Sequence, residues 1–437
     1  MNSRQDILIS NTQLIDGSGG PPRPHASVLI QGGRFKKISQ QDISSSAGTI
    51  RIDGQGKFLL PGLFDAHAHL LSGGFDSITE QIDSFDPTIE RRCLMQMLYW
   101  GVTTICNPVQ PLQTASELRA YVQANPLRSP RILFSGPGFT APNGWAGSML
   151  PLARMEPANT ASARTDVNQL AAAKVDFLKV YYDGQCCAFV SPLPKLDKSV
   201  METIVATSHS KHIKVMVHAY DIQNHLDALR AGADIMAHSA VTAEINDEYL
   251  SLARKNNVLY LATLSAYHDA LDPRTTRQFI AQDFVQQTVP KRTLDSLAEG
   301  GPFDAFVNSV KSAYIAGQLP VIFKNLRKVF DAGIPIAVGP DTGIMGAFPG
   351  ISVHREMELM GKAGIPAMAL LVAATSAAAR FFNLDSVGAI VEGGIADAVI
   401  LAADPLTDVR NTRRIEAVIK DGEVVDREQL LHDILND

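Results

Sequence analysis

The chain contains little cysteine and no strong excess of charge of either sign. Four cysteines in 437 residues are too few to crosslink a chain of this length, and no C-x2-C pair occurs, so we expect neither a disulfide framework nor a zinc knuckle. The net charge is −6, from 39 basic and 45 acidic residues. This balance argues against a nucleic-acid-binding protein and against docking on anionic membranes.

Long hydrophobic runs are also absent. The most apolar stretch, residues 366–379, is short for a membrane span, contains Thr375 and Ser376 and ends at Arg380, which predicts a buried helix. The N-terminal residues MNSRQDILIS do not form a basic segment followed by an apolar one, so no signal peptide is expected. We therefore expect a cytoplasmic protein whose partner is a small molecule.

Two motifs of common enzyme classes are missing. No G-x-S-x-G elbow occurs, which disfavours serine hydrolase chemistry, and neither G-x-G-x-x-G nor a P-loop pattern occurs, which disfavours nucleotide binding. What the chain has is 46% hydrophobic and 19% charged residues, the composition of a globular protein with a large core.

The two ends of the chain share a pattern of short β-prone runs. Short β-prone runs broken by glycine and proline fill residues 1–60, and the same texture returns in residues 387–437. Such runs with glycine-rich turns are typical of antiparallel strands. We therefore expect the two segments to pair into one small β-sandwich domain.

The middle of the chain, residues 61–386, alternates strand-like and helix-like runs. The eight strand-like runs are GLFDAHAHL, GVTTICNP, RILFSGPG, FLKVYYDG, VMVHAY, DIMAHSA, VLYLATL and IPIAVGPD. They are continuously apolar, as parallel strands covered on both faces are, and eight βα units are the number a barrel needs. The predicted fold class is therefore α/β, a (β/α)8 TIM barrel. Residues 268–320 form a long insertion that we expect to be a lid over the mouth.

Histidines end three of the predicted strands, at the side where barrel active sites lie. His67 and His69 close the first strand, and side chains two apart on a strand point the same way, so both can bind one ion. His218 and His238 end the fifth and sixth strands. A single histidine at such a place is more often a core residue, but four together favour a metal site.

Lys179 and Asp341 complete the candidate ligand set. Lys179 lies in the middle of a predicted buried strand, where burial lowers an amine pKa and would let it react with carbon dioxide to give a metal-bridging carbamate. Its alternative is a lysine that reaches out of the barrel end. Asp341 ends the eighth strand and could bind metal and accept the proton of a bridging water; its alternative is a turn aspartate before Gly343.

Together these residues predict a two-metal hydrolase. Two divalent ions, for which zinc suits imidazole and carboxylate ligands best, would share a hydroxide that attacks the substrate carbonyl. Asp341 would then pass the proton of the water to the leaving group. We expect an amide bond in a small N-acyl amino acid or dipeptide as the substrate.

The chain resembles the amidohydrolase superfamily, in its binuclear subtype with a carboxylated lysine. Within it, the chain is similar to the imidazolonepropionase-like branch that includes Xaa-Pro dipeptidases (prolidases). The tracts that carry the resemblance are LLPGLFDAHAHL, HAYDIQNHLDALRAGADIMAHS, VGPDTG, HREMELMGKAG, ALLVAATSAAARFF and GGIADAVILAADPLTDV. The resemblance implies that His67, His69, Lys179, His218, His238 and Asp341 occupy the family's metal and catalytic positions, and that the protein is a homo-oligomer.

Two departures from the family concern residues near the substrate. The sixth strand ends Ala237-His238-Ser239 where Glu-His-Gly is common, and the loop after the third strand reads Pro142-Asn143-Gly144-Trp145 where Gly-Gly-His is common. Trp145 could accommodate an apolar group, or serve as loop packing.

The other candidate substrate contacts are aromatic residues and histidines near the predicted mouth. Tyr181 shares the inward face with Lys179 and is the best candidate for a hydroxyl near the carbonyl oxygen, whereas Tyr182 faces the helix layer unless the strand has ended. Tyr267, His268 and His354 follow the last two strands and could reach the mouth.

Three other functions stay open at this point. A lactonase or phosphotriesterase would use the same two-metal site on esters. A mononuclear deaminase would want a glutamate soon after His218, where this chain has Asp221, and no bridging lysine. A scaffold without activity would have lost ligands, and none is missing.

Overall fold

The protein is described from a computed structural model, which covers residues 4–70, 86–144, 153–184, 193–269, 272–300, 303–304, 312–344 and 346–436. Over these ranges the chain is an α/β structure with mixed parallel and antiparallel sheets. No helix within them is long and apolar enough to span a membrane.

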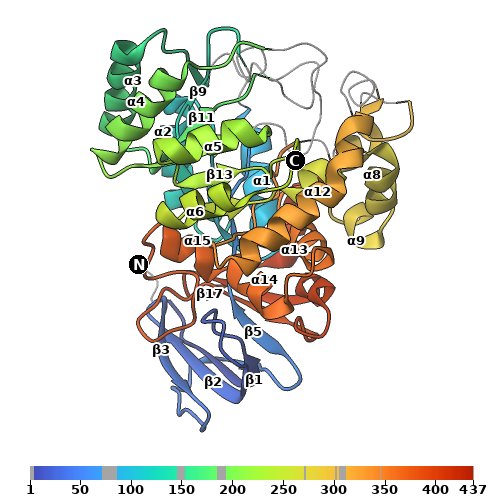
Figure 1. Ribbon diagram of the computed structural model, residues 1–437. Helices are drawn as coiled ribbons and strands as arrows, with labels where there is room; N and C mark the ends of the chain where they lie inside the picture. The colour runs from blue at the N-terminus through green and yellow to red at the C-terminus, as the bar shows by residue number, and fades with distance from the viewer. Residues whose placement is uncertain are drawn as a thin grey trace.

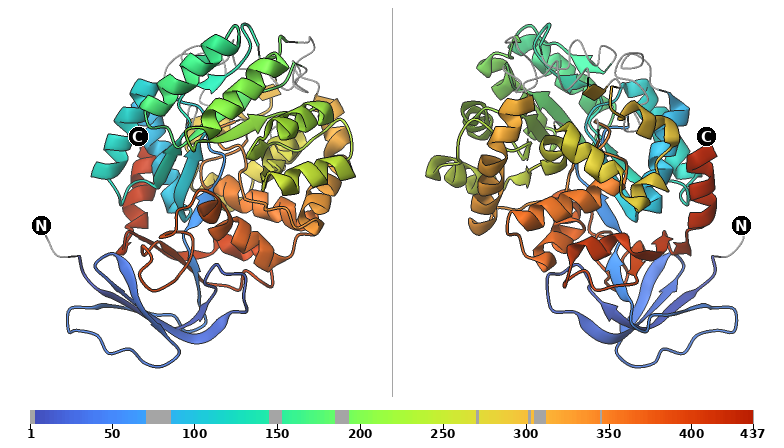
Figure 2. Two further views of the ribbon diagram at one scale, coloured as in Figure 1. Left: turned by 60° about the vertical axis from the view of Figure 1, so that its left-hand side comes forward. Right: turned by 90° about the vertical axis from the view of Figure 1, so that its right-hand side faces the viewer.

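Strands from both ends of the chain form one sheet. In spatial order its strands are β17 (Glu423–Val424), β16 (Ile415–Lys420), β15 (Ala398–Leu401), β5 (Phe58–Pro61), β1 (Ile7–Leu14), β2 (Arg23–Gln31) and β3 (Arg34–Ser39), and β4 (Ile50–Asp53) also pairs with β1. The first half of β1 pairs with β4 and its second half with β5, so β1 changes its partner on one side along its length. Strands β1–β3 lie at one end of the molecule, below the helical body (Figures 1 and 2).

The middle of the chain contributes two parallel sheets. One contains β6 (Leu63–Asp65), β7 (Val102–Asn107) and β8 (Arg131–Phe134); the other contains β10 (Arg154–Met155), β9 (Gly138–Phe139), β11 (Phe177–Tyr181), β12 (Lys214–His218), β13 (Ile235–Ala237) and β14 (Leu259–Leu261). Tyr181 pairs with His218 and His218 with Ala237, so the carboxyl ends of β11, β12 and β13 lie at one edge.

Hydrogen bonds connect the two parallel sheets at both sides. Phe134 of β8 accepts from the amide of Asp176 and donates to the Asp176 carboxylate, just before β11. On the other side, residues 335–342 run between β14 and β6. The amide of Tyr260 donates to Pro335, and the amide of Ala66 donates to Val338.

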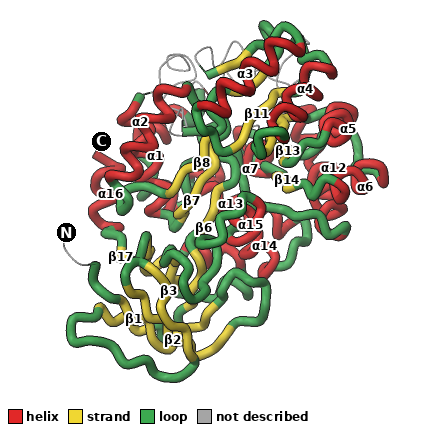
Figure 3. The backbone as a smooth tube through the Cα atoms, turned by 90° about the vertical axis from the view of Figure 1, so that its left-hand side faces the viewer, coloured by secondary structure: helices red, strands yellow, loops and turns green. Residues whose placement is uncertain are grey.

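Helices surround these strands on the outside (Figure 3). They are α1 (Pro87–Tyr99), α2 (Leu112–Ala124), α3 (Thr160–Ala172), α4 (Lys198–His209), α5 (Ile222–Ala231), α6 (Asp247–Lys255), α7 (Leu264–His268), α8 (Pro273–Ile280), α9 (Asp283–Gln286), α10 (Lys291–Ser296), α12 (Ser312–Asp331), α13 (Ile351–Lys362), α14 (Ala367–Ala373), α15 (Ser376–Phe381), the 3-10 turn η1 (Val409–Arg413) and α16 (Arg427–Asn436). The expected insertion 268–320 thus contains α8, α9 and α10, and α12 continues through Pro320.

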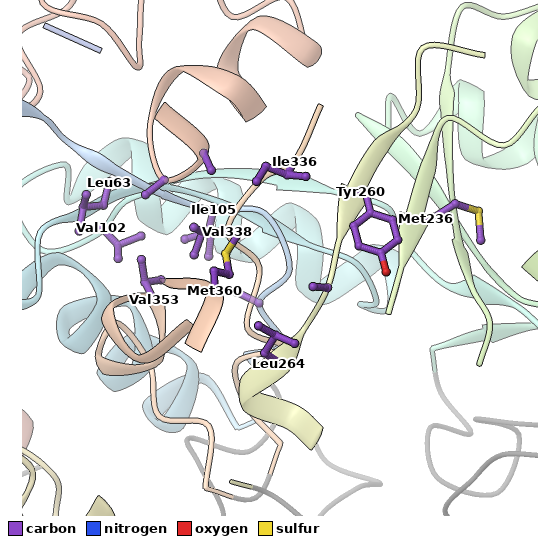
Figure 4. Packing of buried hydrophobic residues seen from close by; sticks show 14 of the residues in the cluster. Leu63, Val102, Ile105, Met236, Tyr260, Leu264, Ile336, Val338, Val353 and Met360 are labelled. Atoms are coloured by element: carbon purple, nitrogen blue, oxygen red, sulfur yellow. The ribbon is translucent and has the colours of Figure 1, made fainter. Parts of the chain in front are cut away.

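Two of the three apolar clusters of the described residues lie among the parallel strands and their helices, and the third lies in the terminal sheet. The larger lies between strands and helices and contains Leu63, Val338 and Met360 (Figure 4). A smaller one contains Phe64, Cys106, Leu133, Phe177 and Met216, contributed by neighbouring parallel strands. Because alternate residues of a strand point to opposite sides, Lys179 shares the side of Phe177, and His218 that of Met216.

Candidate metal centre

The first two candidate ligands directly follow β6. A backbone bridge joins Ala68 to Thr342, so His67 and His69 lie beside the segment that carries Asp341. This approach is close enough to require Gly343, whose φ is 96° and at which a Cβ would lie 2.0 Å from the carbonyl oxygen of His69. The sequence GPDTG therefore brings the carboxylate to the two histidines.

His67, His69 and Asp341 form a group able to hold a metal ion. Oδ1 of Asp341 lies 3.3 Å from Nε2 of His67 and 3.2 Å from Nε2 of His69. The possible ligand atoms of the three residues all lie within 4.8 Å of one another. Nδ1 of both histidines and Oδ1 of Asp341 are buried and have no hydrogen-bond partner among the described residues, which is unusual without a ligand. The donor set fits a divalent ion.

Lys179 reaches the same group from β11. Its Nζ lies 3.2 Å from Nε2 of His67 and 3.7 Å from the sulfur of Met216, and the residue is 1% exposed. Burial lowers the pKa of Lys179 to about 7, although the nearby Asp341 carboxylate opposes this shift. The amine therefore does not leave the interior, and a large fraction of it is neutral at neutral pH.

His218 and His238 stand on the other side of the group. Their ring centres are 4.4 Å apart, and the His238 ring is 5.2 Å from that of His67. Burial holds the pKa of both histidines well below the ordinary value, and Lys179 contributes in the same direction. Both imidazoles are thus neutral, the form that binds metal.

Asp341 is the charged member of the cluster. Burial by itself would raise the pKa of Asp341, but the nearby side chains of His69, His238 and Lys179 hold it below the ordinary value. A carboxylate is therefore present beside four imidazoles and one amine.

Left-handed backbone conformations gather at this edge. His238, which follows β13, has φ 76°; Thr263, which follows β14, has φ 51°; and Asp341, in the segment 335–342, has φ 63°. Such conformations cost free energy in residues other than glycine and are concentrated at functional sites. Thr263 is also a partner of His238, because its Oγ1 lies 2.9 Å from Nδ1 of that ring.

Three tyrosines lie against the histidines. The Tyr181 ring centre is 5.1 Å from that of His218, in keeping with its predicted inward direction. Tyr220 contacts both His218 and His238, with ring centres 4.6 and 4.9 Å apart, and Tyr267 contacts Tyr220 at 5.7 Å. Burial raises the pKa of Tyr181, so its hydroxyl keeps its proton.

Sequence reasoning missed Tyr220 and Asp65. Tyr220 is two residues after His218, a spacing that could have indicated it. Asp65, in the same DAHAH motif as the first histidines, accepts from the amide of His67 at 3.0 Å and from the hydroxyl of Thr342 at 2.7 Å. Burial raises the pKa of Asp65 to about 8 against these two hydrogen bonds.

The remaining sequence candidates lie elsewhere or are not described. Tyr182 is buried in the larger core, with its ring 4.7 Å from Nζ of Lys195. His268 ends α7 and its Nδ1 lies 2.8 Å from Oδ1 of Asp269. His354 is not among the clustered residues: its ring nitrogens are 2.9 Å from Thr412 Oγ1 and from the Trp100 carbonyl. The prediction for Trp145 lies outside the described residues.

The sequence of residues 58–425 matches the model of the amidohydrolase family. The chain belongs to the amidohydrolase family. This confirms the resemblance inferred from the motifs.

Curated relatives share short stretches with this amidohydrolase. The dihydroorotase of Caldanaerobacter subterraneus is 42% identical over 71 residues, which is 16% of this chain and 15% of that protein. The imidazolonepropionase of Vibrio parahaemolyticus is 34% identical over 84 residues, 16% of this chain and 20% of that protein. The aligned stretches thus span about a fifth or less of the relatives' length.

Solved structures resemble this amidohydrolase over nearly its whole length. A Xaa-Pro dipeptidase with bound methionine aligns with TM-score 0.78 and 22% identity, covering 96% of this chain and 99% of the other. Molinate hydrolase aligns with TM-score 0.78 and 22% identity, covering 98% and 96%. Membership of this family supports a hydrolytic enzyme that acts on C–N bonds. The two solved structures, at 22% identity, show that the fold is shared.

Proposed function

We propose that this amidohydrolase cleaves an amide bond in a small N-acyl amino acid or dipeptide, with two divalent ions held by six residues. These are His67, His69, Lys179, His218, His238 and Asp341. The observation that carries the proposal is their convergence: Asp341 Oδ1 lies within 3.3 Å of two imidazole nitrogens, and Lys179 Nζ lies 3.2 Å from one of them. We propose zinc as the metal, because imidazole and carboxylate ligands suit it.

Lys179 is proposed to carry a carboxyl group derived from carbon dioxide. Carboxylation needs the neutral amine, and the pKa of about 7 makes that form abundant at neutral pH. The product has two oxygens and a negative charge, as a bridging ligand requires. It would also remove the cost of an unpaired ammonium beside neutral imidazoles.

The fold proposed for this site is a (β/α)8 barrel. The parallel strands, together with residues 335–342, would close around the smaller core, with the lid 268–320 over the carboxyl ends. Residues 1–60 and 387–437 would then form the second domain. The hydrogen bonds at both sides of the parallel sheets support this arrangement.

Bound divalent ions would polarise the scissile carbonyl and make water acidic enough to attack it at neutral pH. Residues of the chain carry out the proton transfer, bind the carbonyl oxygen and exclude water. Asp341 takes the proton of the attacking water on a carboxylate oxygen and delivers it to the departing amide nitrogen. Tyr181, held protonated by burial, offers its hydroxyl to the carbonyl oxygen. The tyrosines around His218 and His238 exclude water and pack on the substrate.

The direct test is a release assay on zinc-loaded enzyme in bicarbonate buffer. The panel contains N-acyl amino acids and dipeptides, including Xaa-Pro, beside several lactones and a phosphotriester. Release of an amino acid from any amide supports the proposal, and the preferred substrate defines specificity. Turnover of a lactone or phosphotriester with no amide cleaved would replace the proposal with an ester hydrolase using the same site.

A further inference from the structure

The short helix α7 lies between the candidate ligand His238 and the helix α13. Thr263, directly before α7, places its Oγ1 2.9 Å from Nδ1 of His238. Near the other end of α7, the hydroxyl of Tyr267 donates to the carbonyl of Ser239, the residue after His238, at 3.2 Å. Because of these two contacts, the positions of the His238 ring and of the backbone beside it depend on the position of α7.

Two adjacent residues of α13 hold the two ends of α7. The buried carboxylate of Glu356 accepts from the amide of Leu264 at 2.7 Å, and from the amide and hydroxyl of Ser265 at 2.7 and 2.9 Å. Arg355 donates through Nε and Nη2 to the carboxylate of Asp269, at 2.8 and 3.0 Å. Hydrogen bonds and an ion pair from α13 therefore fix both ends of α7.

Apolar packing also attaches α7 to α13. Leu264 belongs to the same buried cluster as Val353 and Met360 of α13 (Figure 4). A buried carboxylate and guanidinium add a desolvation cost that packing does not have, whereas their hydrogen bonds fix direction. These charged residues therefore fix the orientation of α7, in addition to attaching it to α13.

The strained backbone conformation of Thr263 depends on the orientation of α7. Its φ of 51° is unfavourable for a β-branched residue and persists only where neighbouring contacts enforce it. Glu356 binds the amides of the two residues that directly follow Thr263, so the contact acts at the strained point.

We propose that Glu356 and Arg355 are positioning residues of the metal centre, acting through α7 and Thr263 on His238. This inference rests on the proposed function. With Thr263 Oγ1 accepting from Nδ1–H, the proton of the ring is fixed on Nδ1 and Nε2 keeps its lone pair for the metal. Glu356 holds Thr263 in the conformation that makes this possible, and Arg355 fixes the far end of α7.

The test titrates the full-length apoprotein with Co²⁺ in bicarbonate buffer and records visible absorption, which reports the ligands of the ion without any substrate. Thr263→Ala removes the partner of His238 and should weaken the affected Co²⁺ site about 10–100-fold. Glu356→Gln should weaken the same site and change the same absorption band. Because both act on one contact, the double variant should be no weaker than Thr263→Ala alone.

Three variants control the comparison. Glu90→Gln changes another buried glutamate, which accepts from Gln110 at 2.6 Å and has no described contact with α7, and should bind Co²⁺ like the unmodified protein. Thr263→Ser keeps the hydroxyl and should retain most of the affinity. If Glu356→Gln does not fold, as judged by circular dichroism, Ser265→Ala removes one of the three hydrogen bonds of Glu356 and should give a smaller weakening in the same direction.

The possible results separate this inference from the proposed function. Folded Glu356→Gln, or Ser265→Ala in its place, with Co²⁺ affinity and absorption equal to those of the unmodified protein would overturn the positioning role and leave the metal centre intact. A double variant in which the losses of Co²⁺ affinity of Glu356→Gln and Thr263→Ala add fully would also overturn the positioning role. An unmodified protein that takes up no Co²⁺ would overturn the metal centre and this inference together.

Discussion

Lys179 is a buried amine beside a candidate metal-binding histidine. Its amine is 1% exposed, lies 3.2 Å from His67 and has a pKa lowered to about 7 by burial. An amine in this position has no value for stability, because burying an ammonium costs free energy unless a partner compensates. We propose that ligation of metal in the carboxylated form accounts for this buried lysine.

We expect Lys179→Ala to lose bound metal and activity together. The variant lacks the bridging oxygens, and a short-chain carboxylate added to the buffer should partly restore both. Metal content by atomic emission and the rate of amide hydrolysis are the measurements. A variant with full metal content and full rate would eliminate the carboxylated-lysine hypothesis.

Asp341→Asn should separate metal binding from catalysis. Asparagine keeps the size of the side chain and an oxygen for the metal, but it cannot take the proton of the attacking water. We expect much of the metal to remain while kcat falls about 100–10,000-fold, the range that general acid–base catalysis contributes. Near-normal kcat would remove Asp341 from the proton transfer.

The candidate ligands could be predicted from sequence because each one ends or occupies an apolar strand-like run. Strand ends converge in parallel sheets, so position along the chain was enough to bring these residues together. Tyr220 and Asp65 were missed because their roles depend on contacts between side chains of different strands. His354 follows the GPDTG tract closely in sequence, yet α13 turns its ring toward Trp100, away from the site.

At the scale of elements, most of the parallel strands were predictable and the terminal sheet only in part. The predicted eighth strand, IPIAVGPD, forms only an isolated bridge between Ile336 and Tyr260. Continuous apolar runs such as β7 and β11 are buried at every position, as predicted. The sequence texture indicated that the ends pair, but not that β1 changes partner from β4 to β5 along its length. Register of that kind depends on bulges that composition does not reveal.

The junction of α13 with α1 predicts a pH effect on stability. Burial lowers the pKa of His354 to about 3 from its ordinary 6.5, against the opposing hydrogen bond to the Trp100 carbonyl. Between these values the unfolded chain binds a proton that the folded one excludes. The contribution to stability is therefore fully present above about pH 6.5 and is lost as the pH falls toward 3.

His354→Gln should flatten this dependence. We expect the free energy of unfolding of the unmodified protein to fall more steeply than that of the variant, by up to about 1.4 kcal/mol per pH unit in this window. Urea unfolding at several pH values measures the difference. The exposed His432→Gln serves as control and should leave the slope unchanged; equal slopes for all three proteins would contradict the assignment.

At the scale of the whole molecule, an ionic cluster joins the parallel strands to the terminal sheet. Arg131 at the start of β8 pairs with Asp397 and Asp421, and Lys420 pairs with the same two carboxylates. Asp397 and Lys420 have side chains only 2% exposed. Removing one member leaves buried charge incompletely compensated, which is more costly than losing a surface pair.

Arg131→Met should therefore lower the free energy of unfolding by about 3 kcal/mol, the low end for a broken buried pair, since Lys420 still compensates part of the charge. Chemical unfolding followed by tryptophan fluorescence measures this change. Lys57→Met removes a more exposed pair with Glu416 in the terminal sheet and should have little effect. Equal losses for the two variants would show that the cluster has no special role.

The most direct test of the central claim is a metal titration of the apoprotein with amide hydrolysis as the readout. Zinc is added in bicarbonate buffer to protein stripped by a chelator, and the rate is followed against equivalents of metal bound per chain. We expect no hydrolysis without metal and full activity once two ions per chain are bound. Full amide hydrolysis by the metal-free protein would contradict a metal-dependent mechanism, and saturation at one ion would contradict the two-metal site.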